Sequence, residues 1–163
     1  MNLKYEGGYI VRIQEISVWN RDELVAMLAE SSSEGFRHIG RLIHEYESGI
    51  NTFEQEDEAL FECRIHDKVV GICGLNRDPY SEVTDTGRIR RLYVMREFRR
   101  HGVGRRLIDA VILKAENHYA RLVLYTDQPV AGFFYHTLGF SEVTGREKIT
   151  HVLELGEKRS GSY

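Results

Sequence analysis

The sequence predicts a single α/β domain built on a mixed β-sheet. Its 163 residues, 42% of them hydrophobic, are enough to bury one compact core. Only two prolines are present, and no low-complexity tract or internal repeat marks a linker. The predicted segments follow the order β-α-α-β-β-β-α-β-α-β-β, which fits a mixed sheet and neither a Rossmann fold nor a sandwich.

Hydrophobic periodicity justifies each element of that order. Strands are predicted where apolar residues alternate with polar ones or form short runs, at residues 9–16, 60–66, 69–76, 89–94, 121–125, 140–143 and 150–155. Helices are predicted where apolar residues recur every three or four positions, at residues 24–29, 36–47, 103–117 and 130–138. The helix at 103–117 has one broad apolar face, so we expect it to pack on a sheet.

Cap and turn residues mark the boundaries of these elements. Asn20 or Asp22 caps the first helix, and the serine-rich cluster at 31–35 ends it. Asp67 and Lys68 join two apolar runs and predict a tight hairpin. Gly139 ends the last helix in the C′ position, where glycine tolerates a left-handed backbone.

Positive charge is concentrated in one part of an otherwise acidic chain. Residues 88–106 hold eight arginines and one acid, so this segment carries +7, although the whole chain carries −3. Such a segregated basic segment usually faces an anion. We expect no nucleic acid there, because the chain is acidic overall and lacks a nucleic-acid recognition motif. Leu107 interrupts a Gly-x-Gly-x-x-Gly pattern, which disfavours a dinucleotide-binding Rossmann domain.

Targeting signals and metal motifs are missing from the sequence. No apolar stretch approaches the roughly 20 residues that span a bilayer, and residues 1–8 lack the apolar region of a secretory signal. We therefore expect a cytoplasmic protein with no membrane partner, a domain at 1–156 and a flexible tail at 157–163. Cys63 and Cys73 form no metal-binding pattern, so we expect buried, reduced thiols and no metal.

The segment at 99–104 is the strongest local signal. It reads Arg-Arg-His-Gly-Val-Gly and lies between a predicted strand and a predicted helix. Glycines let the backbone approach a ligand, and the start of a helix presents unpaired N–H groups and a positive dipole end. Arginines add forked donors suited to phosphate oxygens. The segment therefore predicts a cradle for a pyrophosphate.

Three blocks of sequence resemble the GNAT superfamily of acyl-CoA-dependent N-acetyltransferases. They are Ile89-x-x-Leu92-Tyr93-Val94, Arg99-x-x-Gly102-x-Gly104 and Ala131-x-x-Phe134-Tyr135-x-x-x-Gly139-Phe140. Their spacing matches over about 55 residues, and the three together are more specific than any short glycine pattern. The resemblance implies a single-domain GNAT fold: a mixed, mostly antiparallel twisted sheet with a splayed central strand pair and helices on both faces.

The resemblance also implies acetyl-CoA as the co-substrate, with no metal. Backbone amides at 99–105 bind the coenzyme A pyrophosphate in this family, and the preceding strand binds the pantetheine through its backbone edge. Gln128 stands where an asparagine is common, and it keeps an amide for a coenzyme contact. The implied coenzyme-binding residues are Leu92, Tyr93, Val94, Arg99, Arg100, His101, Gly102, Val103, Gly104, Arg105 and Gln128.

The catalytic residue implied by the resemblance is Tyr135, at the position where many family members place a tyrosine acid. Arg88 stands where many relatives have a glutamate base, so that base is absent. Deprotonation of the amine is left to a water chain, to the substrate's own equilibrium, or to His151, Glu62 or His136. The lack of a placed cysteine nucleophile favours direct attack in a ternary complex.

The implied function is transfer of an acetyl group to a primary amine of a small molecule or peptide. The acceptor site in this family lies around the first two helices, here residues 24–52, and the closing hairpin near 147–151. Mixed charges there do not select one acceptor. A homodimer is a further partner that the resemblance raises. The rival hypothesis is a non-catalytic acyl-CoA sensor that kept the cradle and lost the base.

Overall fold

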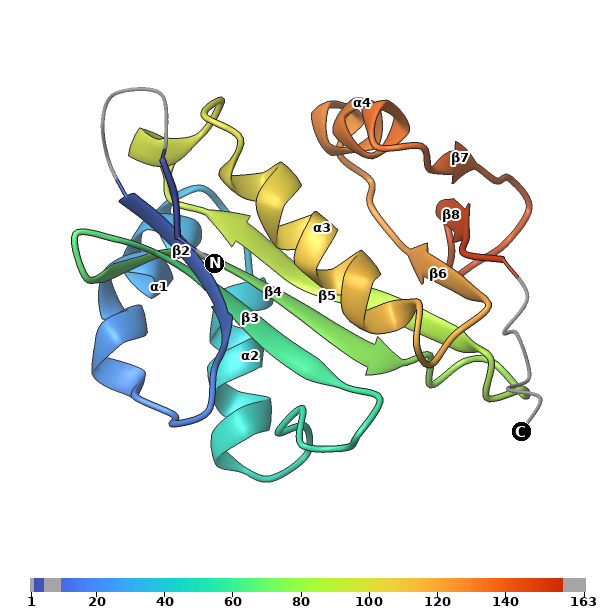
Figure 1. The fold of residues 1–163 in the computed structure, drawn as a ribbon, viewed down its shortest axis with the longest axis horizontal. Helices are drawn as coiled ribbons and strands as arrows, with labels where there is room; N and C mark the ends of the chain where they lie inside the picture. The colour runs from blue at the N-terminus through green and yellow to red at the C-terminus, as the bar shows by residue number, and fades with distance from the viewer. Residues whose placement is uncertain (1, 5–9, 157–163) are drawn as a thin grey trace.

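The structure, a computed structural model, describes residues 2–4 and 10–156. Eight strands form one sheet in the order β1-β2-β3-β4-β5-β6-β8-β7 (Figure 1). Only the β5–β6 pair is parallel among these neighbours. The strands are β1 (Asn2–Lys4), β2 (Ile10–Glu15), β3 (Ala59–Ile65), β4 (Lys68–Arg77), β5 (Thr86–Val94), β6 (Arg121–Leu124), β7 (Ser141–Glu142) and β8 (His151–Glu154). The expected mixed, mostly antiparallel sheet is confirmed.

Helices cover both faces of this sheet. One face carries α1 (Val25–Ser33) and α2 (His38–Glu47), and the other carries α3 (Val103–Ala115) and α4 (Pro129–Thr137) (Figure 1). Two short 3₁₀ turns complete the order, η1 (Arg21–Leu24) before α1 and η2 (Arg96–Phe98) after β5. Figure 1 shows α3 lying over the middle of the sheet, along the direction of β4 and β5. The sheet therefore separates two hydrophobic clusters, one on each face.

The predicted elements are confirmed, with small shifts at their ends. The Asn20 side chain accepts a hydrogen bond from the Asp22 amide at the start of η1, and Gly139 follows α4 with a φ of 95°. The hairpin turns one residue earlier than predicted, because His66 and Asp67 both adopt left-handed backbones, as a type I′ turn requires. β5 begins three residues before the predicted strand, and β1 was not predicted. The proposed tail at 157–163 lies outside the described residues.

The apolar face of α3 forms the centre of the larger cluster. Leu107, Ile108 and Val111 are fully buried against the sheet, as their spacing predicts. Cys63 and Cys73 lie in the same cluster as free thiols, and burial raises the pKa of both. The two cysteines are therefore packing residues, held in the protonated form.

A hydrogen-bonded cluster around Glu34 joins α1 to the segment that follows β5. Two guanidinium nitrogens of Arg99 donate to the Glu34 carboxylate at 2.7 and 2.9 Å, and the Tyr93 hydroxyl donates to it as well. Glu30 accepts from the same hydroxyl at 3.0 Å and from the Arg96 amide at 2.6 Å. The hydrogen bonds from Arg99, and after them the one from Tyr93, lower the pKa of Glu34 to about 2. The cluster fixes where the chain enters the loop before α3.

Truncating Leu107 is expected to destabilise the fold strongly. Leu107→Ala removes a fully buried side chain, so the free energy of unfolding should fall by about 2–5 kcal/mol. Leu113→Ala makes the same change on the solvent side of α3, at a side chain that is 68% exposed, and should cost less than about 0.5 kcal/mol. Urea unfolding measures both, and equal losses would contradict the packing of α3.

Removing the Glu34 charge is expected to give a pH-dependent loss of stability. At pH 7, Glu34→Gln should lower the free energy of unfolding by about 1–3 kcal/mol, as for a hydrogen bond to a charged group. The folded pKa is about 2, below the usual 4.5, so the contribution is complete above pH 4.5 and is lost as the pH falls toward 2. Urea unfolding from pH 7 to pH 3 should show the wild-type advantage shrinking only below pH 4.5.

The matched control for this measurement is Glu56→Gln, which neutralises an exposed carboxylate. It should leave the free energy of unfolding nearly unchanged throughout the same range. A wild-type advantage over Glu34→Gln that grew on acidification would contradict the role of the Glu34 cluster.

Candidate active site

The sheet opens between its two central parallel strands. β5 pairs with β6 at only three positions, ending at Arg88 opposite Val123, although β5 continues to Val94. The rest of β5 therefore has backbone groups without a β6 partner on that edge. The splayed central pair that the resemblance implied is confirmed, and it makes an opening between the strands.

A β-bulge bends β5 beside this opening. Ile72 pairs with Tyr93, but Gly74 pairs with Arg90, so two β5 residues stand opposite Cys73. One of them, Arg91, has a φ of 61°, a conformation that a residue with a Cβ adopts only at a cost. Its guanidinium donates to both carboxylate oxygens of Glu45 on α2 at 3.1 Å. This ion pair helps to hold the bulge in place.

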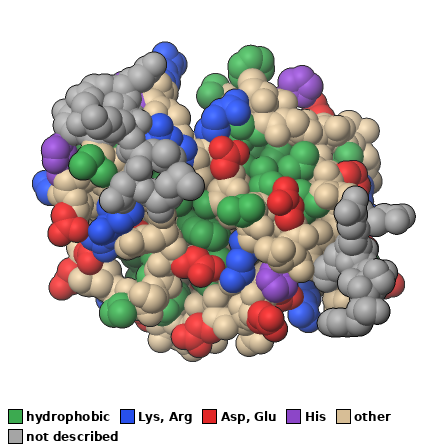
Figure 2. Space-filling model, in the orientation of Figure 1, with side chains coloured by type: hydrophobic (Ala, Val, Ile, Leu, Met, Phe, Trp, Pro, Cys, Tyr) green, Lys and Arg blue, Asp and Glu red, His purple; other side chains and the backbone are tan. Residues whose placement is uncertain are grey.

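The loop before α3 presents its backbone at one end of the opening. Arg100 and Gly102 have φ values of 65° and 82°, and left-handed residues of this kind turn successive N–H groups into a concave anion site. α3 begins at Val103 without a side-chain cap, which leaves the N–H groups of its first turn free of side-chain acceptors. Figure 2 shows Lys and Arg side chains gathered beside a notch at the upper edge of this face, over the start of α3.

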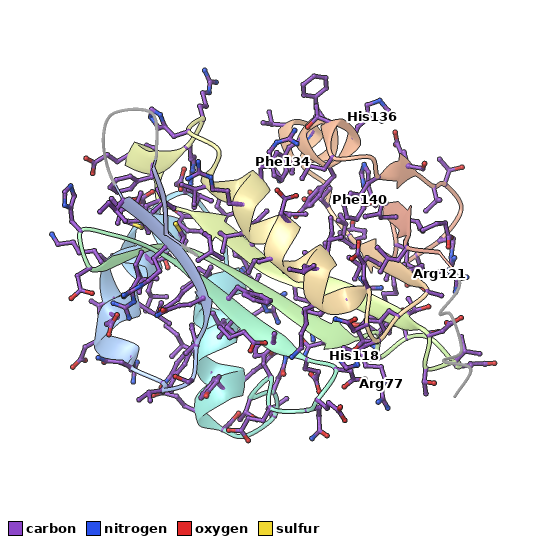
Figure 3. The ribbon with its side chains drawn as sticks, in the orientation of Figure 1. Arg77, His118, Arg121, Phe134, His136 and Phe140 are labelled. Atoms are coloured by element: carbon purple, nitrogen blue, oxygen red, sulfur yellow. The ribbon has the colours of Figure 1, made fainter. Side chains whose placement is uncertain are left out.

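The two glycines of this loop have different reasons to be glycine. Gly102 needs the left-handed backbone, and a Cβ there would meet nothing within 4 Å. A Cβ on Gly104 would lie 3.3 Å from the Phe134 ring, so this glycine lets α3 and α4 approach each other. Figure 3 shows Phe134 reaching from α4 toward α3. Gly102 thus shapes the loop, and Gly104 closes the helix contact beside it.

The predicted coenzyme residues form a continuous path from β5 through this loop. The side chains of Arg100, His101 and Arg105 are exposed, whereas Arg99 is held by Glu34 and by the Val94 carbonyl at 2.9 Å. The other members of the set, apart from Gln128, lie on β5 or at the start of α3. Leu92 and Val94 pack toward α3, Val103 packs from α3 into the same cluster, and the Tyr93 side chain turns to α1.

Gln128 lies at the far side of the opening. It is the N-cap residue of α4, it is exposed, and its amide nitrogen donates to Asp127 at 3.1 Å. Its backbone N–H is bound by Thr126 at 3.1 Å. Its side chain therefore already has a local partner at the start of α4.

Tyr135 lies under the opening, on the inner side of α4. It is 6% exposed, and its ring makes edge contacts with Phe134 and Phe140 at centroid distances of 5.2 and 5.4 Å. Burial, with a smaller effect from Cys73, raises the pKa of Tyr135 above its usual value. The phenol therefore stays protonated at neutral pH and can only donate its proton to a stronger base in the site.

The candidate bases named by the sequence lie in three different places. His151 is buried beside Tyr135, with ring centroids 6.2 Å apart, and its Nδ1 lies 2.9 Å from the Thr150 hydroxyl. His136 points away from the site on the outer side of α4 (Figure 3). Glu62 is bonded to Gln14 and Arg64 on the β2 side of the sheet. The fold brings only His151 of these three next to Tyr135.

Arg88, at the position of the missing base, is neutralised within the protein. It is 5% exposed, its Nε donates to Asp78 at 2.8 Å, and its guanidinium lies 5.1 Å from the centre of the Tyr80 ring. The residue closes the last β5–β6 pair instead of standing free in the opening. Its charge is therefore largely balanced before any acceptor enters.

A cavity of about 480 Å³ opens on the α2 side of the sheet. Its wall is formed by Glu45 near the end of α2, the segment 49–55, Glu58 just before β3, and side chains of β4 and β5, including Asn76 and Arg90. The sequence placed the acceptor at 24–52 and 147–151, which reaches only part of this wall. The strand residues were missed because their separation in the chain gives no local signal.

No group of three or more His, Cys, Asp or Glu side chains within residues 10–156 is placed to hold a metal ion. In the same part of the chain, none of the helices has the length and apolar character needed to cross a bilayer.

Comparison with known proteins agrees with the fold. The sequence family described as acetyltransferase (GNAT) domain matches residues 27–155. An acetyltransferase structure from Exiguobacterium sp. 255-15 is 34% identical, covers 88% of this chain and 93% of its own, and has a TM-score of 0.77. No curated protein matches the chain.

Two less similar structures share the fold. A GNAT-family acetyltransferase from Streptococcus pneumoniae is 23% identical, with coverage of 87% of this chain and 95% of its own and a TM-score of 0.67. A Salmonella typhimurium protein, solved with its cofactor acetyl-CoA, is 15% identical, with coverage of 93% and 98% and a TM-score of 0.66. The family match over most of the chain and the 34% identical relative lead to one conclusion: this protein is a member of the GNAT family of acetyltransferases.

Proposed function

We propose that this protein transfers the acetyl group of acetyl-CoA to a primary amine, by direct attack within a ternary complex. The observation that carries the proposal is the opening between β5 and β6, which has an anion-binding loop at one end and a protonated tyrosine beneath it. Membership of the GNAT family supports acetyl-CoA as the donor. The cavity on the α2 side supplies a separate entrance for the acceptor.

Acetyl-CoA would lie along β5 and end at the loop before α3. Backbone amides at 99–105 receive the pyrophosphate, and the exposed Arg100 and Arg105 add positive charge around it. The unpaired edge of β5 at Leu92 and Val94 accepts the pantetheine amides as an added strand would. Arg99 contributes through its backbone, because its side chain is held by Glu34.

The chemistry then needs one proton moved to sulfur and one removed from nitrogen. The neutral amine attacks the thioester carbon, the C–N bond forms, and the C–S bond breaks. Tyr135 donates its proton to the leaving sulfur, since its phenol is protonated at neutral pH. The proton lost by the amine leaves through water or through His151, the candidate base that lies beside Tyr135.

A non-catalytic acyl-CoA sensor is the second candidate, and Arg88 is the observation that favours it. An arginine bound to Asp78 occupies the position of the usual glutamate base. A sensor would bind acetyl-CoA and release no thiol when amines are added. Release of coenzyme A thiol that depends on an amine excludes this candidate.

Acetyl-CoA is expected to stabilise the folded protein through the loop before α3. At about 100 times its dissociation constant the ligand adds about 2.7 kcal/mol, which corresponds to a rise in Tm of about 5–10 °C. Replacing Arg100 and Arg105 together by Glu should remove most of this rise, because both side chains surround the proposed phosphate site. Thermal unfolding with and without ligand measures it.

The matched control replaces Arg37 and Arg41 together by Glu, an equal reversal of charge at two exposed residues at the start of α2. The rise in Tm should persist in this variant. No rise with acetyl-CoA at millimolar concentration, and none with longer acyl-CoAs, would contradict the proposed donor site.

Replacing Tyr135 with Phe is expected to slow turnover without weakening coenzyme binding. A positioned general acid contributes about 100- to 10,000-fold, so kcat in an amine-dependent thiol-release assay should fall by at least about 100-fold. The dissociation constant for acetyl-CoA should stay within about twofold. Tyr46→Phe, at a ring stacked on Trp19 on the α2 side, is the control and should keep full activity. A Tyr135→Phe enzyme with wild-type kcat would contradict the acid role.

A further inference from the structure

Three arginines in or near the wall of the acceptor cavity each have a carboxylate partner. Arg77 donates to Asp57 at 2.7 Å, and Arg91 donates to Glu45 at 3.1 Å. Arg88, on the strand behind the cavity, is bound to Asp78. Neighbouring carboxylates thus balance the charges of these three arginines. Their guanidinium groups are less available to a ligand than an unpaired guanidinium would be.

Arg90 is the exception. Within residues 10–156, no hydrogen bond or ion pair joins its guanidinium to another side chain, although it is partly buried and lines the cavity. Burial lowers the pKa of Arg90, the charge of Arg91 adds to that effect, and the charge of Glu45, which is bound to Arg91, opposes it. A partly buried cation that shares its nearest carboxylate with another arginine is costly unless a further anion joins it. The missing anion can come with the substrate.

The unmet donors of the neighbouring arginines point to the same need. Among the described residues, one buried terminal nitrogen of Arg88 has no acceptor, and the Nε of Arg91 has none either. Both residues lie within two positions of Arg90 on β5. This short stretch of strand therefore holds more positive charge and more donors than its acids satisfy.

The position of Arg90 puts an anion close to the reacting atoms. β5 leaves β6 after Arg88, so Arg90 lies two residues into the opening where the thioester is proposed to sit. It pairs with Gly74 on β4, beside the bulge, and its side chain faces the cavity on the α2 side. A group bound to Arg90 would thus be a near neighbour of the amine that attacks the thioester.

We propose that the acceptor is an amine bearing a carboxylate near its reacting nitrogen, as in an α-amino acid, and that Arg90 binds this carboxylate. This rests on the acetyltransferase function proposed above. One unpaired guanidinium matches the single charge of a carboxylate, and planar fork geometry favours two parallel hydrogen bonds. The cavity of about 480 Å³ is in the size range of small-molecule sites and leaves room for a side chain.

The test compares amines that differ only in the anionic group. Thiol release from acetyl-CoA is measured with the standard α-amino acids that have a primary amine and no thiol, with their decarboxylated amines, such as 2-phenylethylamine for phenylalanine, and with 1-aminoethylphosphonate for alanine. At least one amino acid should exceed its decarboxylated partner by about 10- to 100-fold in kcat/KM, as expected for a charge-assisted hydrogen bond. A preference for the phosphonate would overturn the carboxylate assignment.

Arg90→Gln then assigns that preference to the residue. It should raise KM for the preferred amino acid by about 10- to 100-fold, leave its decarboxylated partner nearly unchanged, and leave the acetyl-CoA dissociation constant unchanged, which also shows that the variant is folded. Arg90→Lys should restore part of the loss. Arg77→Gln, at a cavity arginine paired with Asp57, is the matched control and should change the preference by less than about threefold.

The outcomes separate this inference from the proposed function. Turnover of amines with no preference for a carboxylate, or a preference that survives in Arg90→Gln, overturns the role of Arg90 and leaves the acetyltransferase function standing. If no amine is turned over, the acetyltransferase function fails. Calorimetric titration of the same amino acids into the complex with coenzyme A then decides the inference: binding that Arg90→Gln abolishes supports it, and no binding overturns it.

Discussion

The rest of the site depends on the early end of the β5–β6 pairing. A parallel pair that stops after three positions leaves a strand edge with unsatisfied backbone groups in the middle of a sheet, where edges are usually covered. The bulge at Arg91 and its bond to Glu45 bend β5 at the same place. Without this divergence, the loop before α3, the ring of Tyr135 and the α2-side cavity would be three unconnected features.

Charge pairing gives the arginines of the basic segment different roles. Arg99 is bound to Glu34, Arg88 to Asp78 and Arg91 to Glu45, so these three hold the backbone of β5 and the loop in place. Arg100 and Arg105 are exposed at the loop, and Arg90 faces the cavity with no ion-pair partner among the described residues. The basic segment therefore contains arginines held in ion pairs, arginines at the proposed donor site and one arginine at the proposed acceptor site.

Much of the fold could be predicted because its signals are local. The apolar stripe of α3 predicted its buried face, and Gly139 marked the end of α4. Where an observed boundary differs from the predicted one, pairing across the sheet sets it. β5 starts at Thr86 because that residue pairs with Arg121 on β6. The turn at His66 and Asp67 lies one residue before the predicted turn. The strand register, in which Ile65 pairs with Lys68, sets its position.

The loop before α3 and the family resemblance could both be predicted from the sequence alone, since contiguous residues form the left-handed turn at Gly102 and the start of α3. It could not determine which arginines are free, because ion pairs such as Arg99 with Glu34 join residues far apart in the chain. Only the tertiary structure decided that Arg88 is neutralised, that His151 lies beside Tyr135, and that Arg90 faces a cavity. The physical reason is that a side chain's charge state and availability depend on neighbours that folding alone brings within reach.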